Sequence, residues 1–553
     1  MISASEERRP PRPFPAAAQH PRALFAVYLP ALLAAAVAAS YFYRLAVTGS
    51  SNFDDAYMFV RYADNLVRGD GYAWNPGEGS TFGCTSIAYT FLVAALRRLL
   101  PGVAAGKLLL WTSGLLGLAA FGLLVLAVRA AVSHKVLRSP LWLSLVLGAL
   151  LLAQSAYAYH AATGMDTMLS LAGNCLLVLV LFTRARDGGR AGLALAALCG
   201  YLVFLIRPDN GFYGLLFPAL LLGFGFKLGW RRAAFFAAAF LALLALDTWL
   251  KILVFGDPLP LSFYAKHALL AAGYAGEWNP VTYLCELVTY LSPFLLLIAL
   301  TVKRPVLPIL AAFAIPLALT LAYYFTVMQV MGFEFRFSFP SLPFVVVPAA
   351  ICLDRFLASP EDWTARRRAM GRRALVILPL ACLFWISREP SARAYARHVL
   401  RPQPRAAAHL PTAAEAPRME WWNGIRAMAD FGARLPQGTL LAASEHGLVA
   451  ARNPHLRILD LVGLHDPEIA HHGLRGDYLK RRAPDLIWLP HPDYVGLRRQ
   501  IFDSATFQQD YVYLPLAFSY GLAVRRDRTD LLQMVRAELA DLYRRWGPPP
   551  EEP

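Results

Sequence analysis

The first residues that could do chemistry are two adjacent carboxylates, Asp54 and Asp55. They follow an apolar stretch, 23–47, that is long enough to cross a bilayer, so we expect them at a membrane surface. Adjacent carboxylates in a partly desolvated site repel each other, which raises one pKa into the range that suits a general base. The same pair also suits the first turn of a helix, where capping and the helix dipole favour Asp. The residues alone leave the catalytic and the capping interpretations open.

Basic side chains at the ends of apolar stretches could hold a phosphate or pyrophosphate group. The candidates are Arg61, Arg207, Lys266 and Arg336. Arg offers two parallel donors to a phosphate, and Lys offers a compact charge. For each of them singly, snorkelling of the charged end to the membrane surface is the more common reason for such a position. Lys266 is the strongest candidate, because Tyr264 and His267 flank it after a Pro-rich turn.

Polar and aromatic residues in the segments between apolar stretches, and near the C-terminus, could contact a sugar or an acceptor. They are Tyr57, Trp74, Asn75, His160, Asp166, Asp209, Tyr264, His267, Glu445, His446, Asp460 and Asp466. For Trp74 the alternative is the aromatic belt at a membrane surface, and for His160 it is a hydrogen-bonded polar side chain. No group of residues has the sequence spacing of a metal site, so we predict no metal centre and leave dependence on a divalent ion open. Walker, dinucleotide and nucleophile-elbow motifs are absent from the sequence, so a soluble nucleotide donor has no support.

The elements that must position these residues are mainly membrane helices. The chain has 553 residues, of which 57% are hydrophobic and 16% charged, and a mean hydropathy of +0.43. A soluble domain carries about 25% charged residues. The net charge of +16 lies largely in short segments between apolar stretches, which is typical of membrane orientation signals and not of nucleic-acid binding. The six cysteines lie in or beside apolar segments and predict no disulfide framework.

Apolar stretches of about 20 residues predict about eleven membrane spans. The candidate ranges are 24–46, 84–100, 107–130, 140–156, 165–183, 191–206, 212–228, 232–255, 283–302, 305–328, 340–356 and 373–388. Basic clusters alternate consistently from residue 165 onward but not between 84 and 156, so we expect one candidate there to be re-entrant, interfacial or wrongly divided. With that resolved, the first loop, 48–83, and the other polar turns named above share the outer side.

After residue 388 the composition becomes charged and Pro-rich, with no run long enough to span a membrane. Short β-like runs at 439–443, 456–462, 486–489 and 511–514 and helical patterns at 423–434 and 530–545 predict an α/β domain. The predicted organisation is a disordered cytoplasmic N-terminus at 1–22, a membrane domain at 23–388 and an extracytoplasmic α/β domain at 389–553.

An ordered set of motifs carries a family resemblance. The series Asp54-Asp55-Ala-Tyr57, then Arg61-Tyr62, then Trp74-Asn75-Pro76-Gly77-Glu78 resembles the first extracytoplasmic loop of GT-C fold glycosyltransferases. It is most similar to the AftB-type terminal arabinofuranosyltransferases of the mycobacterial cell wall and their bacterial relatives. The similarity continues, in order, at Gly164-Met165-Asp166, Arg207-Pro208-Asp209, Tyr264-Ala265-Lys266, Arg336-Phe-x-Phe-Pro340 and Asp460-Leu-Val-Gly463-Leu464-x-Asp466.

This resemblance implies a membrane glycosyltransferase with a polyprenyl-phosphate sugar donor, such as decaprenyl-phospho-arabinofuranose. It implies a cell-envelope glycan or glycoprotein as acceptor, an active site outside the bacterial cytoplasmic membrane, and a catalytic part for Asp54 and Asp55. We expect a monomer and no cofactor beyond the lipid-linked substrate. The chain departs from the family at Asp70, where His is common, and at Leu261-Ser262-Phe263. These departures put the identity of the transferred sugar in doubt.

Two other classes remain as alternatives. A transporter or flippase of lipid-linked sugars would also carry charges at span ends, but it predicts groups near the membrane midplane and repeated halves, which the sequence does not show. A receptor or assembly protein would act through its C-terminal domain. Which carboxylate acts, and whether the sugar configuration inverts, stay open.

Overall fold

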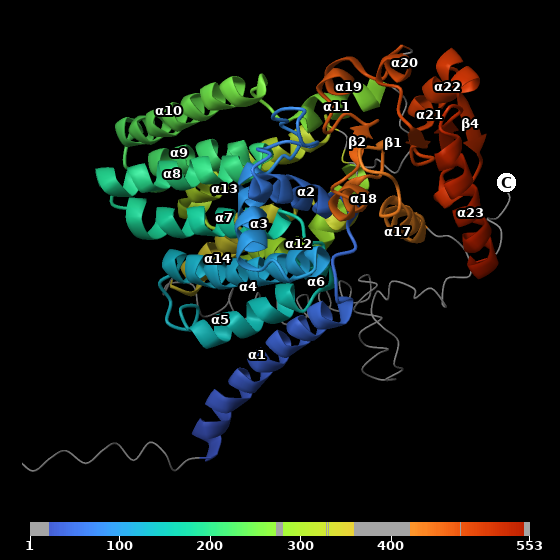
Figure 1. The fold of residues 1–553 in the computed structure, drawn as a ribbon. Helices are drawn as coiled ribbons and strands as arrows, with labels where there is room; N and C mark the ends of the chain where they lie inside the picture. Colours follow the sequence, from blue (N-terminus) through green and yellow to red (C-terminus); the bar gives the residue numbers. More distant parts are fainter. Residues whose placement is uncertain are drawn as a thin grey trace, which may run out of the picture.

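Two parts of different construction make up the structure: a body of long apolar helices and a small sheet domain near the end of the chain (Figure 1). The computed structural model describes residues 21–271, 280–327, 329, 331–358, 421–475 and 477–546. Most of the segment predicted to be disordered, 1–22, and the predicted span 373–388 lie outside the described residues. The described residues 421–546 are called the C-terminal domain below.

Six of the described helices are long and apolar enough to cross a membrane. They are α1 (Pro21–Thr48), α4 (Ala105–Ala131), α7 with its last turn (Thr167–Val180 and Leu181–Ala185), α10 (Trp230–Phe255), α12 (Pro280–Thr301) and α13 with its first turn (Arg304–Val306 and Leu307–Tyr324). Two bent pairs raise the number to eight if each counts as one span. These are Pro140–Leu152 with Ser155–Ala162, bent by 78°, and Phe333–Ser341 with Pro343–Leu357, which contains α14, bent by 54°. The polytopic helical class is thus confirmed, whereas the predicted count of about eleven is not.

Three predicted spans correspond to short or interrupted helices. The range 84–100 contains α3 (Ile87–Leu99), and the range 191–206 is α8 (Arg190–Ile206). The range 212–228 is divided by wide helical turns on both sides of α9 (Phe217–Leu220). The 13 residues of α3 are about 20 Å long, less than the roughly 30 Å of a bilayer core. The irregularity predicted between 84 and 156 therefore coincides with the short α3 and with the first bent pair, which contains α5 (Pro140–Leu147) and α6 (Ser155–Ala162).

Helix α2 (Asp54–Arg68) belongs to the body and packs against the C-terminal domain. Its apolar residues recur at helical spacing and are buried, and it ends at Gly69, whose φ of 91° is left-handed. One hydrophobic core contains Phe59 of α2 together with Leu448 and Trp488 of the C-terminal domain. The C-terminal domain is therefore packed on α2, as Figure 1 shows for α18 (Gly447–Arg452).

The C-terminal domain is built on a five-stranded sheet in the described residues, with strand order β2-β1-β3-β5-β4. The strands are β1 (Leu440–Ala443), β2 (Arg457–Asp460), β3 (Leu486–Trp488), β4 (Tyr511–Leu514) and β5 (Leu522–Arg525). The other helices are α17 (Trp421–Gly432), α19 (Pro467–His472), α20 (Tyr478–Arg482), α21 (Val495–Phe502), α22 (Ala505–Asp510) and α23 (Thr529–Trp546). The predicted runs coincide with β1 to β4, with α17 and with α23. Strand β5 was not predicted, because a run of four residues that ends in a charged side chain shows little hydrophobic periodicity.

Strands β2, β1 and β3 are parallel, so their carboxyl ends meet at one edge of the sheet. Asp460 is the last residue of β2, and Glu445 and His491 lie in the segments that follow β1 and β3. Helix α11 (Leu261–Ala271) of the body packs against α19 beside this edge (Figure 1). The edge where α/β domains usually bind ligands therefore faces the helical body.

Candidate active site

A cavity of about 570 Å³ lies between the helical body and the carboxyl ends of the parallel strands. Its volume is in the ordinary range of small-molecule sites. The charged and polar lining from the body includes Asp55, Asp166, Arg207, Asp209, Lys266, Tyr323, Tyr324 and Arg336, and that from the C-terminal domain includes Ser444, Glu445, His465, His491 and Asp493. Segments far apart in the sequence thus form one site.

The two carboxylates of α2 point to different partners. Asp54 is 1% exposed, and its carboxylate accepts hydrogen bonds from the backbone amides of Gly447 at 2.9 Å and Leu448 at 2.8 Å. Burial raises the pKa of Asp54, although these hydrogen bonds oppose the shift. Asp55 lines the cavity, and its Oδ2 lies 3.7 Å from Nη1 of Arg336. Successive residues of a helix point about 100° apart, so neighbours of one type reach different surroundings.

Arg336 and Lys266 carry the positive charge that is least neutralised. Arg336 is 5% exposed, and its Nε and Nη1 have no hydrogen-bond partner among the described residues. Lys266 makes no hydrogen bond or ion pair within the described chain, and its Nζ lies 4.8 Å from the centre of the Phe337 ring. Burial lowers the pKa of Lys266 to about 8, and the charges of Arg336 and Arg207 contribute to the shift. A bound anion would relieve this repulsion.

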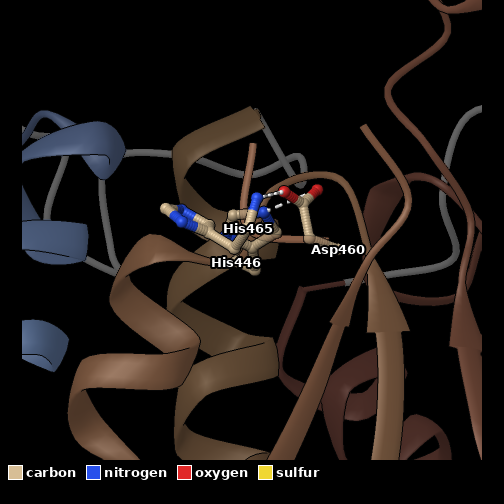
Figure 2. Close-up of side chains that lie close together, drawn as sticks. All are labelled: His446, Asp460 and His465. Atoms are coloured by element: carbon tan, nitrogen blue, oxygen red, sulfur yellow. Dashed lines mark hydrogen bonds and ion pairs between the residues drawn. The ribbon is translucent and has the colours of Figure 1, made fainter. Parts of the chain in front are cut away.

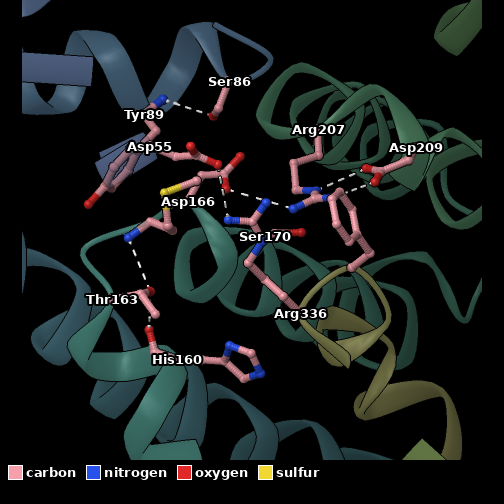
Figure 3. A network of polar contacts seen from close by, with 12 residues as sticks. Asp55, Ser86, Tyr89, His160, Thr163, Asp166, Ser170, Arg207, Asp209 and Arg336 are labelled. Atoms are coloured by element: carbon pink, nitrogen blue, oxygen red, sulfur yellow. Dashed lines mark hydrogen bonds and ion pairs between the residues drawn. The ribbon is translucent and has the colours of Figure 1, made fainter. Parts of the chain in front are cut away.

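Arg207 is held by two carboxylates of the body (Figure 3). Its Nε donates to Oδ1 of Asp209 at 3.0 Å, and its Nη1 lies 3.7 Å from Oδ1 of Asp166. The hydroxyl of Tyr324 also donates to Asp209, at 2.9 Å. The guanidinium of Arg207 is therefore fixed in position, and it adds less free charge to the cavity than Lys266 does.

The C-terminal domain supplies an acidic wall opposite these cations. Glu445 follows β1 and lines the cavity, and among the described residues it has no hydrogen-bond or ion-pair partner. Burial raises the pKa of Glu445 well above its usual range, and Asp54 and Asp55 raise it further. Nearby, Nδ1 of His491 lies 3.2 Å from the carboxylate of Asp493. Such groups suit hydrogen bonds to the hydroxyls of a sugar.

Arg61, predicted as a phosphate ligand, lies outside the described lining of the cavity. It is 1% exposed, and its guanidinium donates to backbone carbonyls of both α2's own loop and the C-terminal domain. The acceptors are the carbonyls of Trp74 at 3.0 Å, Ala450 at 3.0 Å, Asn453 at 3.2 Å and Leu456 at 2.8 Å, with the Asn75 side chain at 3.4 Å. All its donors are used to hold the two parts together.

Several residues predicted to contact a sugar are structural in the same way. The Tyr57 hydroxyl donates to the Ser51 carbonyl at 2.8 Å. The side chain of Asn75 exchanges two hydrogen bonds with the backbone of Ile458 in β2, each at 2.9 Å, and the indole of Trp74 donates to the same carbonyl at 3.2 Å. The first loop is thus bonded to β2, an edge strand of the sheet, and these three side chains lie outside the described lining of the cavity.

Other predicted contacts also lie outside the described lining. His160 is fully buried, and its Nε2 lies 2.8 Å from the carbonyl oxygen of Glu334. Asp466 caps the start of α19, where its Oδ1 accepts a hydrogen bond from the Ile469 amide at 3.0 Å. The ring of Tyr264 packs on His471, at 4.3 Å between centres. His267 belongs to α11, but its side chain is outside the described residues. Of the predicted acceptor contacts, Asp166, Asp209 and Glu445 line the cavity.

The structure adds lining residues that sequence reasoning missed, among them Tyr323, Tyr324, His465, His491 and Asp493. His491 and Asp493 follow a predicted strand, so the rule on the ends of parallel strands could have selected them. Tyr323 and Tyr324 lie at the end of an apolar helix, where such residues are typical of the aromatic belt at a membrane surface.

One group of three side chains has the composition of a metal site, although the sequence predicted none. His446, Asp460 and His465 are buried, and one ligand atom from each lies within 4.8 Å of the others. They are separated along the chain and share no motif spacing. Pairing of β1 with β2 brings them together.

Comparison with known families adds one match. A family described as a domain of unknown function (DUF8728) matches residues 413–533, which cover most of the C-terminal domain. No curated protein matches the chain. The matched family names no activity, so the inference of function depends on the site.

Proposed function

We propose that this protein is an integral membrane glycosyltransferase. It moves a sugar, arabinofuranose-like by resemblance, from a polyprenyl-phosphate donor to an extracytoplasmic glycan or glycoconjugate. One observation carries the proposal: Asp55 of the first loop meets Arg336 in a cavity that also contains the unpaired Lys266. A carboxylate beside Arg336 and the unpaired Lys266 suits a reaction that activates a hydroxyl and releases a phosphate.

Lys266 and Arg336, positioned beside Arg207, would hold the donor phosphate. The bond from the anomeric carbon to the phosphate oxygen breaks, and its electron pair leaves with the polyprenyl phosphate, which these cations stabilise. The acceptor oxygen forms the new bond to the anomeric carbon, and its proton passes to the carboxylate of Asp55. That carboxylate also stabilises the oxocarbenium-like transition state. Asp54 is bonded to backbone amides, so we assign the reacting role to Asp55.

The direction of the helices supports an extracytoplasmic site. Helix α7 starts beside Asp166 in the cavity and ends near Arg184, and α10 starts near Arg231 and ends shortly before Leu259 in the cavity. Basic clusters thus lie at the ends of helices opposite the cavity. Because such clusters favour the cytoplasmic side, we propose that the cavity and the C-terminal domain lie outside the cytoplasmic membrane.

The test is transfer by the purified protein in proteoliposomes that contain candidate polyprenyl-phosphate sugars, with analysis of the product linkage. Asp55→Asn is expected to reduce turnover by roughly a hundredfold or more, as loss of a general base does. Asp64→Asn is a matched control, because Asp64 lies on the same helix and pairs with Arg97. Full transfer by correctly inserted Asp55→Asn protein would contradict the mechanism.

A second pair of variants tests the phosphate site. Lys266→Ala is expected to weaken donor binding at least tenfold, whereas Lys107→Ala changes an exposed lysine of α4 and should have no effect. Unchanged donor binding in Lys266→Ala would remove Lys266 from the site. Movement of labelled donor between leaflets without product would favour a flippase over a transferase.

A further inference from the structure

Two histidines and an aspartate meet at the carboxyl ends of β1 and β2. The parallel register places Ala443 opposite Asp460, so the segment after β1 passes over the end of β2 and brings His446 there. Asp460 starts a tight turn, in which its Oδ1 accepts from the Val462 amide at 2.8 Å and its Oδ2 from the His465 amide at 2.7 Å. The turn brings His465 to the same place, and ligand atoms of the three side chains lie within 4.8 Å of one another (Figure 2).

Two ring nitrogens of this cluster are buried without the hydrogen bonds that buried polar groups normally make. Nε2 of His446 lies 3.0 Å from Oδ1 of Asp460, but Nδ1 of His446 has no hydrogen-bond partner within the described residues. Nε2 of His465 likewise has no hydrogen-bond partner in the described chain. Both histidines are at most 5% exposed.

A shared ion accounts for this geometry better than a shared proton. A proton shared between His446 and Asp460 would leave Nε2 of His465, which is buried beside them, without a partner. Ligands of tetrahedral zinc, with bonds of about 2.0–2.1 Å, lie about 3.3 Å apart and direct their lone pairs at the ion instead of at each other. The other nitrogen of a metal-bound histidine is usually held by a hydrogen bond. Nδ1 of His465 has such a contact, 3.0 Å from the Tyr62 hydroxyl, and Trp74 stacks on the same ring at 3.9 Å.

We infer that His446, Asp460 and His465 bind one divalent transition-metal ion in tetrahedral coordination. Two imidazoles and one carboxylate suit Zn²⁺, which accepts three protein ligands and leaves a fourth position for water. His465 also lines the cavity, so the fourth position is near the substrate space. The ion would join the segment after β1 to the segment after β2 and would hold the wall that carries Glu445. The inference concerns how this wall is held, so it stands independently of glycosyl transfer.

The test uses the full-length protein in nanodiscs, with an affinity tag that contains no histidine and after removal of bound metal by a chelator. Co²⁺ reports its coordination through visible absorption, and we expect one tetrahedral Co²⁺ site per chain that Zn²⁺ displaces. Metal analysis of the untreated protein by mass spectrometry provides a second measurement. Octahedral, non-stoichiometric or absent binding by the wild-type protein would overturn the inference without any variant.

Variants then locate the ion. Asp460→Asn and His465→Gln are expected to weaken Co²⁺ binding at least tenfold. His472→Ala is the matched control, because His472 is an exposed histidine of the same domain, and it should bind Co²⁺ like the wild type. Undiminished binding in folded Asp460→Asn and His465→Gln proteins would place the ion elsewhere and contradict the assignment.

Discussion

Replacing Asp54 by alanine is expected to open the contact between α2 and α18. The buried carboxylate accepts two backbone amides, from Gly447 at 2.9 Å and Leu448 at 2.8 Å. A hydrogen bond to a charged group contributes about 1.5–3 kcal/mol, and an amide buried without an acceptor is costly by a similar amount. Two such bonds at the lower value amount to about 3 kcal/mol, which is roughly a hundredfold in the local opening equilibrium. Asp54→Asn keeps one acceptor oxygen and should lose about half of this free energy.

Amide hydrogen exchange over peptides that span 444–452 measures this opening. The method reports local free energies and does not require reversible unfolding of the whole membrane protein. Asp55→Ala is the matched control: its carboxylate lies in the cavity, 3.7 Å from Arg336, so the exchange of α18 should stay at the wild-type rate. Wild-type exchange in Asp54→Ala protein would refute the division of roles between the two carboxylates, and so would equal acceleration by Asp55→Ala.

Other perturbations probe the interdomain contact and the cavity. Arg61→Ala leaves several buried carbonyls without a donor, so it should destabilise docking of the C-terminal domain by at least about 3 kcal/mol. Limited proteolysis should then be faster, and resistance to proteolysis equal to that of the wild type would contradict this prediction. The charged form of Lys266 should bind the donor phosphate, so donor affinity should fall as pH rises above about 8, by up to about tenfold per pH unit, and this dependence should vanish in Lys266→Ala protein. A Cβ added at Gly83 would collide with the His465 ring, so Gly83→Ala should lower both transfer and Co²⁺ binding, whereas Gly122→Ala, with open space around its Cβ, should change neither.

The composition and periodicity of the chain were enough to predict the class of structure. Long apolar stretches must be helical in a bilayer, because a backbone without water satisfies its own hydrogen bonds there, and six such helices lie in the described residues. Short β-like runs likewise indicated four of the five strands. The number of spans was less accessible, because short and bent helices have the same apolar composition as straight ones that cross.

Site residues were predictable only where position along the chain determines direction. Asp166 and Arg207 stand at the ends of apolar helices, so a topology drawn from basic clusters put them on one face, and the structure joins them in an ion pair at 3.7 Å. Arg61 has a similar place at the sequence level, but it faces the C-terminal domain. Its burial depends on a domain almost 400 residues away, to which it donates three hydrogen bonds.

The sequence by itself determined that several helices are long and apolar enough to cross a membrane, that an α/β domain follows them, and that carboxylates and cations gather at helix ends. Only the tertiary structure separated Asp54 from Asp55, because two neighbours of one type differ solely in direction around the helix and in what packs there. It also decided that His446, Asp460 and His465 meet, since parallel pairing of β1 with β2 joins segments that no local pattern relates. Chemistry of this kind depends on distances between side chains, and those are fixed by packing between segments rather than by spacing along the chain.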